Sequence, residues 1–233
     1  MLSVEDLHVS IEGKEIVRGV SFDLSKEAIM IIGPNGSGKS TMLMALMGRP
    51  RYETSGRIVL DGEDISGYPT RKRSLKGLSL AFQNPVEVDG VKVKTLLNKI
   101  AEKFGRSDEE VKEVIRLMRL EELEKRYVNV GFSGGEKKRF ELARLLLQRP
   151  KYALFDEPDS GVDADNMRII AEGINRLISE GSGVVIVSHY ARILRFVRPS
   201  RVYIMHNGKF VKQGDASLAE EVLENGYSSV LSE

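Results

Sequence analysis

The chain contains no cysteine and no tryptophan among its 233 residues. The absence of cysteine excludes disulfide bonds, thiolate metal sites, a cysteine nucleophile and any iron–sulfur cluster held by this chain's own thiolates. Any chemistry that this chain performs must therefore use oxygen and nitrogen groups.

The chain also lacks an excess of charge of either sign, because 35 Lys and Arg residues against 34 Asp and Glu residues leave a net charge of +1. A nucleic-acid binder needs surplus Lys and Arg to neutralise phosphates, so we expect no nucleic-acid partner. Arg71, Lys72, Arg73 and Lys76 form a basic cluster that could contact nucleic acid. On a neutral protein, a solvated helix or loop is the favoured interpretation of that cluster.

Long apolar segments are absent too. No purely apolar run is longer than the six residues from Met42 to Met47, whereas a membrane-spanning helix needs about 18–20. The first residues show no basic region followed by an apolar segment, so we expect no signal peptide and a soluble, cytoplasmic protein. The length suits one large α/β domain, or one domain with a modest insertion.

Strand patterns recur along the chain. Residues 1–25 alternate apolar and polar side chains, which predicts short antiparallel strands. Residues 28–32 predict a strand that is buried on both faces. The pair Asn207-Gly208 predicts a type I′ hairpin turn. Further strands are expected at 57–60, 79–82, 152–155 and 184–187.

Helical patterns alternate with these strands. Ser107 and Glu110 form a capping box that opens a helix, and Gly181 closes another after a stripe of apolar residues at 167–178. Helices are also expected at 40–47 and from Ser133 to about Gln148. Alternating strands and helices predict an α/β fold with a mainly parallel sheet and a helical insertion near residues 90–130.

A phosphate-binding pattern follows the first buried strand. Glycines allow the backbone to wrap a phosphate, so that successive N–H groups and a helix N-terminus point at the anion. Lys39 can reach the β- and γ-phosphates, and the Ser40 hydroxyl can coordinate Mg²⁺. The less favoured alternative is a glycine-rich turn with an exposed lysine. The pattern comprises Gly33, Pro34, Asn35, Gly36, Ser37, Gly38, Lys39, Ser40 and Thr41.

Two adjacent carboxylates, Asp156 and Glu157, end a later apolar strand. In open α/β sheets, ligands bind at the carboxyl ends of the strands. We therefore expect Asp156 to support a magnesium ion, and Glu157 to orient or deprotonate the attacking water.

The order of the motifs resembles the ATP-binding-cassette (ABC) ATPases over essentially the whole chain. The phosphate loop is followed by Gln83, by Ser133-Gly134-Gly135 before a helix, by Asp156-Glu157, by Ser160–Asp163 and by His189. The resemblance implies a P-loop NTPase fold of the ABC type over residues 1–233, with an N-terminal antiparallel β subdomain. It also implies a nucleotide-binding core at about 1–83 and 150–233 and a helical subdomain at about 84–149.

The resemblance also implies a role for each motif residue. Gln83 is the Q-loop glutamine, which contacts Mg²⁺ and the attacking water, and His189 is the switch histidine at the γ-phosphate. Ser133, Gly134, Gly135 and Glu136 form the signature motif, which acts on ATP bound to a second cassette, and Asp163 ends the D-loop. From the residues alone, Ser133 would be an ordinary helix cap and His189 a structural histidine.

Two positions depart from the general family pattern. Glu136 stands where the signature motif commonly has glutamine, and it places a carboxylate near the expected nucleotide interface. No aromatic residue is available near Ile11 to stack on adenine. Ile11 and Val17 are the nearest apolar candidates for that contact.

A narrower resemblance points to the SufC group, the ATPase subunits of SUF iron–sulfur cluster assembly. It is carried by Phe82–Glu87, Gly131–Arg139, Asp159–Asp163 and Ser188–Leu194. It implies SufB- and SufD-like scaffold proteins as partners, ATP and Mg²⁺ as ligands, and an ATP-dependent homodimer of cassettes. Pro158 and the Glu141–Gln148 segment look more like transporter ATPases.

We therefore expect a magnesium-dependent ATPase that dimerises on ATP and drives a SUF-type scaffold. The main alternative is the ATPase subunit of an ABC membrane transporter, whose partner would be a membrane permease. A second alternative is a protein that closes on ATP without useful hydrolysis.

Overall fold

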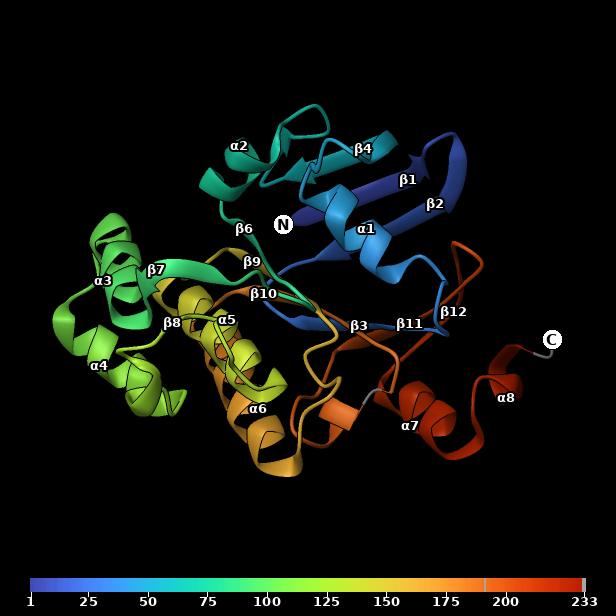
Figure 1. Ribbon diagram of the computed structural model, residues 1–233. Coiled ribbons are helices and arrows are strands. Elements are labelled where there is room, and N and C mark those ends of the chain that lie inside the picture. Colours follow the sequence, from blue (N-terminus) through green and yellow to red (C-terminus); the bar gives the residue numbers. More distant parts are fainter. Residues whose placement is uncertain (191, 232–233) are drawn as a thin grey trace.

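A central six-stranded sheet runs through the computed structural model, which describes residues 1–190 and 192–231 (Figure 1). Every neighbouring pair of strands is parallel except the β11–β12 hairpin. Ala191, in the Ser188–Leu194 motif, lies outside the described residues. The sheet order is β12 (Lys209–Gly214), β11 (Arg201–His206), β3 (Ala28–Ile32), β10 (Gly183–Ser188), β9 (Tyr152–Asp156) and β6 (Leu78–Ala81).

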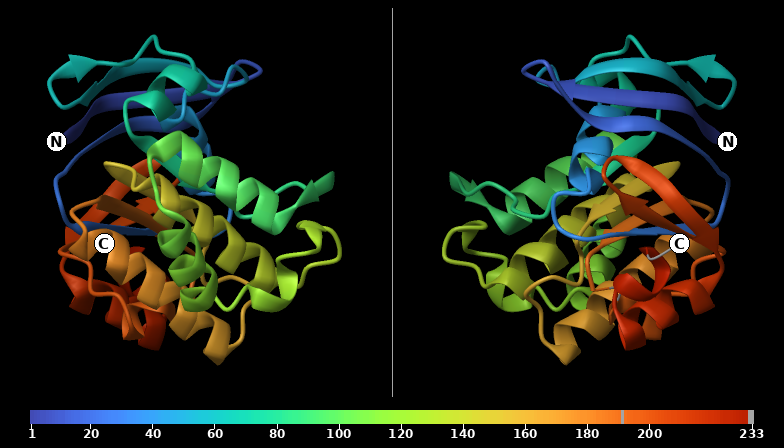
Figure 2. Two further views of the ribbon diagram at one scale, coloured as in Figure 1. Left: turned by 90° about the vertical axis from the view of Figure 1, so that its left-hand side faces the viewer. Right: turned by 90° about the vertical axis from the view of Figure 1, so that its right-hand side faces the viewer.

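A second, antiparallel sheet covers one face of the central sheet. Its strand order is β2-β1-β4-β5, and in both views of Figure 2 it forms the top layer. The expected α/β fold with an N-terminal antiparallel β part is confirmed. The strands are β1 (Leu2–Ile11), β2 (Lys14–Leu24), β4 (Glu53–Leu60) and β5 (Glu63–Asp64).

Two apolar cores lie on opposite faces of the central sheet. Strand β3 contributes to both, because its side chains alternate: Ala28, Met30 and Ile32 face one core, and Ile29 and Ile31 face the other. All five residues are buried. The strand is therefore buried on both faces, as its uninterrupted apolar run predicts.

Helices cover the other face of the central sheet (Figure 2). Between β6 and β9 the chain forms three α-helices, one 3₁₀ helix and a small β ribbon, β7–β8, which the apolar pattern did not predict. Among the described residues, no helix has the length and apolarity needed to cross a lipid bilayer. The elements of this layer are β7 (Val88–Lys92), α3 (Val93–Phe104), α4 (Asp108–Leu117), η1 (Glu121–Leu123), β8 (Tyr127–Val128), α5 (Gly134–Gln148) and α6 (Ala164–Ser179).

The remaining elements are α1 (Lys39–Leu46), between the two sheets, and η2 (Arg192–Arg195), α7 (Ala216–Asn225) and α8 (Ser228–Leu231) near the C-terminus. The local signals expected from the sequence are present. Ser107 and Glu110 form both hydrogen bonds of the capping box, and Gly181 adopts a left-handed φ of 92° just after α6. Asn207 and Gly208 have φ values of 46° and 81°, as a type I′ turn requires.

The interpretation of the basic cluster as solvated is wrong for Arg73. This residue lies in α2 (Thr70–Leu75) and is 2% exposed. Its guanidinium donates to the backbone carbonyls of Tyr68, Ala45, Leu46 and Ser66 at 2.6–3.0 Å. A buried cation requires such partners, so Arg73 joins α2 to the end of α1, while Arg71, Lys72 and Lys76 are exposed.

Candidate nucleotide-binding and hydrolysis site

The carboxyl ends of four parallel strands bring the predicted motifs to one edge of the central sheet. Val187 on β10 pairs with Asp156 on β9 and with Ile31 on β3. The phosphate loop follows β3, the paired carboxylates end β9, and His189 follows β10. Gln83 comes shortly after Ala81, which pairs with Phe155.

The phosphate loop is supported from below by the β11–β12 hairpin. The Gly208 amide donates to the Ser37 carbonyl at 3.0 Å, and the Gly208 carbonyl accepts from Arg18 of β2. A Cβ atom at Gly33 would lie 2.1 Å from the Met205 carbonyl oxygen, so this position admits only glycine. Gly36 and Gly38 have φ values of 77° and 107°, which is the left-handed backbone that such a loop needs.

Lys39 folds back over this loop and is 5% exposed. Its ammonium group donates to the carbonyls of Gly33 at 2.7 Å and Pro34 at 3.0 Å, and to the Ser37 hydroxyl at 3.4 Å. Burial lowers the pKa of Lys39. The ammonium group of Lys39 is therefore held by the backbone and a hydroxyl of the loop itself.

Ser40 and Asp156 meet directly. The Ser40 hydroxyl donates to Asp156 Oδ1 at 2.8 Å, although the residues lie 116 positions apart in the chain. Desolvation raises the pKa of the Asp156 carboxyl group. Hydroxyl, carboxylate and carboxamide oxygens are the hard ligands that Mg²⁺ prefers, so Ser40, Asp156 and Gln83 fit the expected ion.

Glu157 is held in an unusual backbone conformation, with a φ of 51°. Its amide donates to the Val187 carbonyl at 2.9 Å, and its carboxylate accepts from the Gln83 side chain at 2.7 Å. A non-glycine residue keeps a positive φ only where its surroundings fix it, and such residues cluster at functional sites. His189 completes this edge, with Nδ1 3.3 Å from the Gly33 carbonyl oxygen.

The signature residues form a separate group at the start of α5. The Ser133 hydroxyl accepts from the Glu136 amide at 3.2 Å, and the Glu136 carboxylate accepts from the Ser133 amide at 2.7 Å. Both bonds of a capping box are therefore present, and glutamate serves this box as well as glutamine does. In the structure, the unusual residue Glu136 stabilises the helix start.

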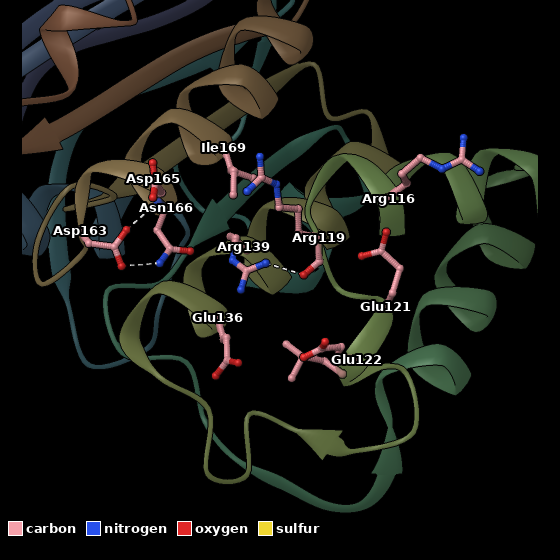
Figure 3. A pocket seen from close by; sticks show the side chains of 11 residues that line it. Arg116, Arg119, Glu121, Glu122, Glu136, Arg139, Asp163, Asp165, Asn166 and Ile169 are labelled. Carbon is pink, nitrogen blue, oxygen red and sulfur yellow. Dashed lines mark hydrogen bonds between the residues drawn. The ribbon is translucent and has the colours of Figure 1, made fainter.

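The D-loop residue Asp163 lies beside this group and caps α6. Its carboxylate accepts from the Asn166 backbone and side chain at 2.8 and 2.7 Å. A Cβ atom at Gly135 would lie 2.6 Å from the Asn166 side chain. Figure 3 shows Asp163, Asn166, Glu136 and Arg139 around a polar pocket of about 890 Å³.

The two adenine candidates differ in exposure. Val17 is fully buried, so its side chain is not available to a nucleotide, whereas Ile11 is half-buried. The sequence reasoning overlooked Ile16, which is also half-buried and whose backbone oxygen lies 3.2 Å from the position of a Cβ at Gly38. Ile16 is therefore an apolar residue adjacent to the phosphate loop.

Two more residues near the site were not singled out from the sequence. The Lys138 ammonium on α5 donates to the backbone carbonyls of Glu157 and Ser160, which joins α5 to the loop that follows β9. The Tyr227 hydroxyl donates to the His189 carbonyl at 2.8 Å. Lys138 lies within the quoted SufC-like motif, whereas nothing in the sequence marks Tyr227.

Curated relatives cover nearly the whole chain. A probable ABC transporter ATP-binding protein of Streptococcus pyogenes is 41% identical over 99% of this chain and 94% of its own length. The probable ATP-dependent transporter SufC of Escherichia coli is 40% identical over 97% of each chain. The iron–sulfur cluster assembly protein SufC of Plasmodium falciparum is 38% identical over 100% of this chain and 72% of its own length.

The family profile and the solved structures agree with these relatives. The profile described as ABC transporter matches residues 17–160. The solved ATP-binding subunit of an ABC transporter superposes with a TM-score of 0.79, at 25% identity over 97% of this chain and 93% of that one. The chain belongs to the ATP-binding-cassette ATPases.

Proposed function

We propose that this chain hydrolyses ATP, with magnesium, between two copies arranged head to tail, and that it drives a SUF-type iron–sulfur assembly scaffold. The observation that carries the hydrolytic role is the Ser40–Asp156 hydrogen bond of 2.8 Å. It joins two motifs that are far apart in the sequence, beside the buried ammonium of Lys39.

The phosphate loop binds the triphosphate. Its backbone amides and the start of α1 face the anion, and Lys39 leaves the carbonyls of Gly33 and Pro34 to pair with the phosphates. Ser40, Asp156 and Gln83 would hold Mg²⁺, which when bound supplies positive charge to the phosphate oxygens. We assign the contact with adenine to Ile11 and Ile16, whose side chains are apolar and half-buried.

Glu157 positions the attacking water and accepts its proton. The carboxylate must first release the Gln83 amide, which donates to it at 2.7 Å. His189 donates to the transferred phosphate, and together with Lys39 it stabilises the charge that spreads over the phosphate oxygens during in-line attack.

The signature motif acts on ATP bound to a second copy. Within the described ranges 1–190 and 192–231, no hydrogen bond joins Ser133, Gly134 or Gly135 to the phosphate loop. Amides at the first turn of the 15-residue helix α5 form a suitable anion site. The γ-phosphate of ATP bound to a second chain's phosphate loop supplies that anion, and Asp163 at the adjoining D-loop lies at the same interface.

The partner proposal rests on the SufC-like motifs and on the relatives named SufC. We assign SufB- and SufD-like scaffold proteins as the partners of this chain, docked on the segment that follows Gln83, roughly Asn84 to Gly105. The Streptococcus pyogenes relative is named as an ABC transporter ATP-binding protein, and that name favours the alternative of a membrane permease as partner. Purification of the chain from its native cells separates the two: a cysteine-bearing scaffold without membrane spans supports our proposal, and a polytopic membrane protein contradicts it.

Glu157→Gln tests the hydrolytic mechanism. We expect phosphate release to fall about 100-fold or more, because a general base contributes roughly 10²–10⁴ to such rates. ATP binding should persist, and light scattering should detect a dimer that accumulates with ATP and magnesium. Glu220→Gln, an exposed position on α7, is the matched control and should retain wild-type turnover. Unchanged turnover in Glu157→Gln would remove this residue from the mechanism.

A further inference from the structure

The C-terminal segment contacts the nucleotide site through one aromatic side chain. Tyr227 lies between α7 and α8, and α7 packs beside β11 and η2 (Figure 1). Tyr227 comes 38 residues after His189, and its hydroxyl donates to the His189 carbonyl oxygen at 2.8 Å. The segment is thereby attached to the loop that carries the switch histidine.

The ring of Tyr227 makes a second contact with the same residue. The phenol and imidazole rings are nearly parallel, at 10°, with their centroids 6.2 Å apart. His189 Nδ1 also lies 3.3 Å from the Gly33 carbonyl oxygen of the phosphate loop. Tyr227 thus contacts the His189 backbone through its hydroxyl, and its ring lies nearly parallel to the imidazole.

Tyr227 keeps its proton under physiological conditions. Desolvation raises the pKa of its hydroxyl to about 12, against a smaller opposing effect of the Gly33 backbone. The phenol is therefore a permanent donor to the His189 carbonyl. Tyr190 also contacts the imidazole, with centroids 4.5 Å apart at 55°, but its side chain is 57% exposed.

We propose that Tyr227 is a positioning residue, which acts through His189 by fixing the direction in which the imidazole faces the phosphate loop. This inference rests on the role that the proposed function gives to His189. Its consequence is that the C-terminal segment controls the catalytic step without contacting the nucleotide. If Tyr227 only packed against the helical core, its substitution would affect stability and would not depend on His189.

Nuclear magnetic resonance of the histidine side chains tests the contact without reference to activity. The chain has only 3 histidines, so His8 and His206 are internal references. Tyr227→Leu removes the ring and should shift the imidazole signals of His189 alone, whereas Tyr227→Phe keeps the ring and should shift them less. Tyr68→Phe, which loses a hydroxyl bond to Glu63 of the same 2.8 Å length, is the matched control. Unshifted His189 signals in Tyr227→Leu would overturn the proposal.

Kinetics in two backgrounds test the positioning role. We expect Tyr227→Phe to lower kcat about three- to tenfold, the usual effect of one hydrogen bond, with an unchanged Kd for ATP. In the His189→Ala background the same substitution should have no further effect. An equal loss in both backgrounds would show a structural role and overturn the proposal. Unchanged turnover in His189→Ala would instead refute the role of His189, and the resonance shifts would still decide whether Tyr227 orients its ring.

Discussion

Asp156 illustrates how a buried charge serves binding at the expense of stability. It is 3% exposed at the end of β9, and desolvation raises the pKa of its carboxyl group even though Ser40, Lys39 and Lys138 act in the opposite direction. Without nucleotide, the folded protein therefore favours the neutral acid more than the unfolded chain does. A divalent ion at this position would reverse that preference.

Asp156→Asn should therefore stabilise the protein in the absence of nucleotide and magnesium. The amide oxygen still accepts from Ser40, and the cost of burying a charge disappears. We expect a gain of about 1 kcal/mol at pH 7, or roughly 2–4 °C in Tm for a chain of this size. Because the folded pKa is raised, the cost arises as pH increases past the unfolded value of 3.8. The gain should thus vanish below about pH 3.8, and equal Tm values at pH 7 would contradict this account.

At the scale of elements, the first turns of α5 and α6 pack tightly against each other. Each helix is capped by its own residue, Ser133 and Asp163 respectively. They approach closely at Gly135, where a Cβ would lie 2.6 Å from the side chain of Asn166. That side chain also donates to the Asp163 carboxylate at 2.7 Å. The signature motif and the D-loop therefore form one unit.

Gly135→Ala should displace Asn166 and disturb the cap of α6. We expect a destabilisation of about 1–3 kcal/mol, the usual cost of overpacking, together with reduced ATP turnover. Adding Asn166→Ala removes the clash, so the double variant should regain most of the lost stability in urea unfolding. Asn166→Ala alone is the control, because Asp163 still accepts from the backbone amide of residue 166. A double variant that is less stable than Gly135→Ala would disprove the steric explanation.

Elements whose signals are local were predicted from the sequence, and contacts between distant elements were not. The Ser107–Glu110 capping box and the Asn207-Gly208 turn depend on a few neighbouring residues, and both are present. Arg73 is different, because its partners on α1 lie 27–28 positions away, and no sequence pattern shows that they bury a cation.

The candidate site shows the same difference between features with a sequence signal and contacts that only the packing creates. The motif order predicted that Ser40 and Asp156 would lie together, because both follow parallel strands of one sheet. Tyr227 reaches His189 only through the packing of the C-terminal helices, and a tyrosine near a chain end is not a signal. Val17 was a candidate for adenine contact, but the side-chain alternation of β2 turns it into the core.

At the scale of the whole molecule, a charged pair joins the helical layer to the edge of the central sheet. Glu141 on α5 accepts from the Phe82 amide at 3.3 Å and from Arg144 at 2.9 Å. Arg144 also donates to the Leu80 carbonyl of β6 at 2.8 Å. These bonds lie immediately before Gln83. Tilting of α5 would therefore move the backbone that carries this glutamine.

The losses of stability caused by removing Glu141 and by removing Arg144 should not be additive. We expect Glu141→Met or Arg144→Met to destabilise the protein by about 2–3 kcal/mol, because each leaves a poorly solvated partner charge. This figure lies below the range for fully buried pairs, since the Arg144 side chain is 19% exposed. The double variant should lose less than the sum of the single losses in urea unfolding. Strictly additive losses would show that the two charges act independently.

The alternating side chains of β3 have a mechanical consequence. Its five residues are divided between the two apolar cores, so the central sheet separates these cores and packs against both of them. A displacement of β3 would therefore disturb the packing on both faces of the sheet, and it would also move the phosphate loop, which begins at the next residue, Gly33. If a partner docks on the helical layer, as proposed, its binding and the binding of ATP would then affect each other through linkage.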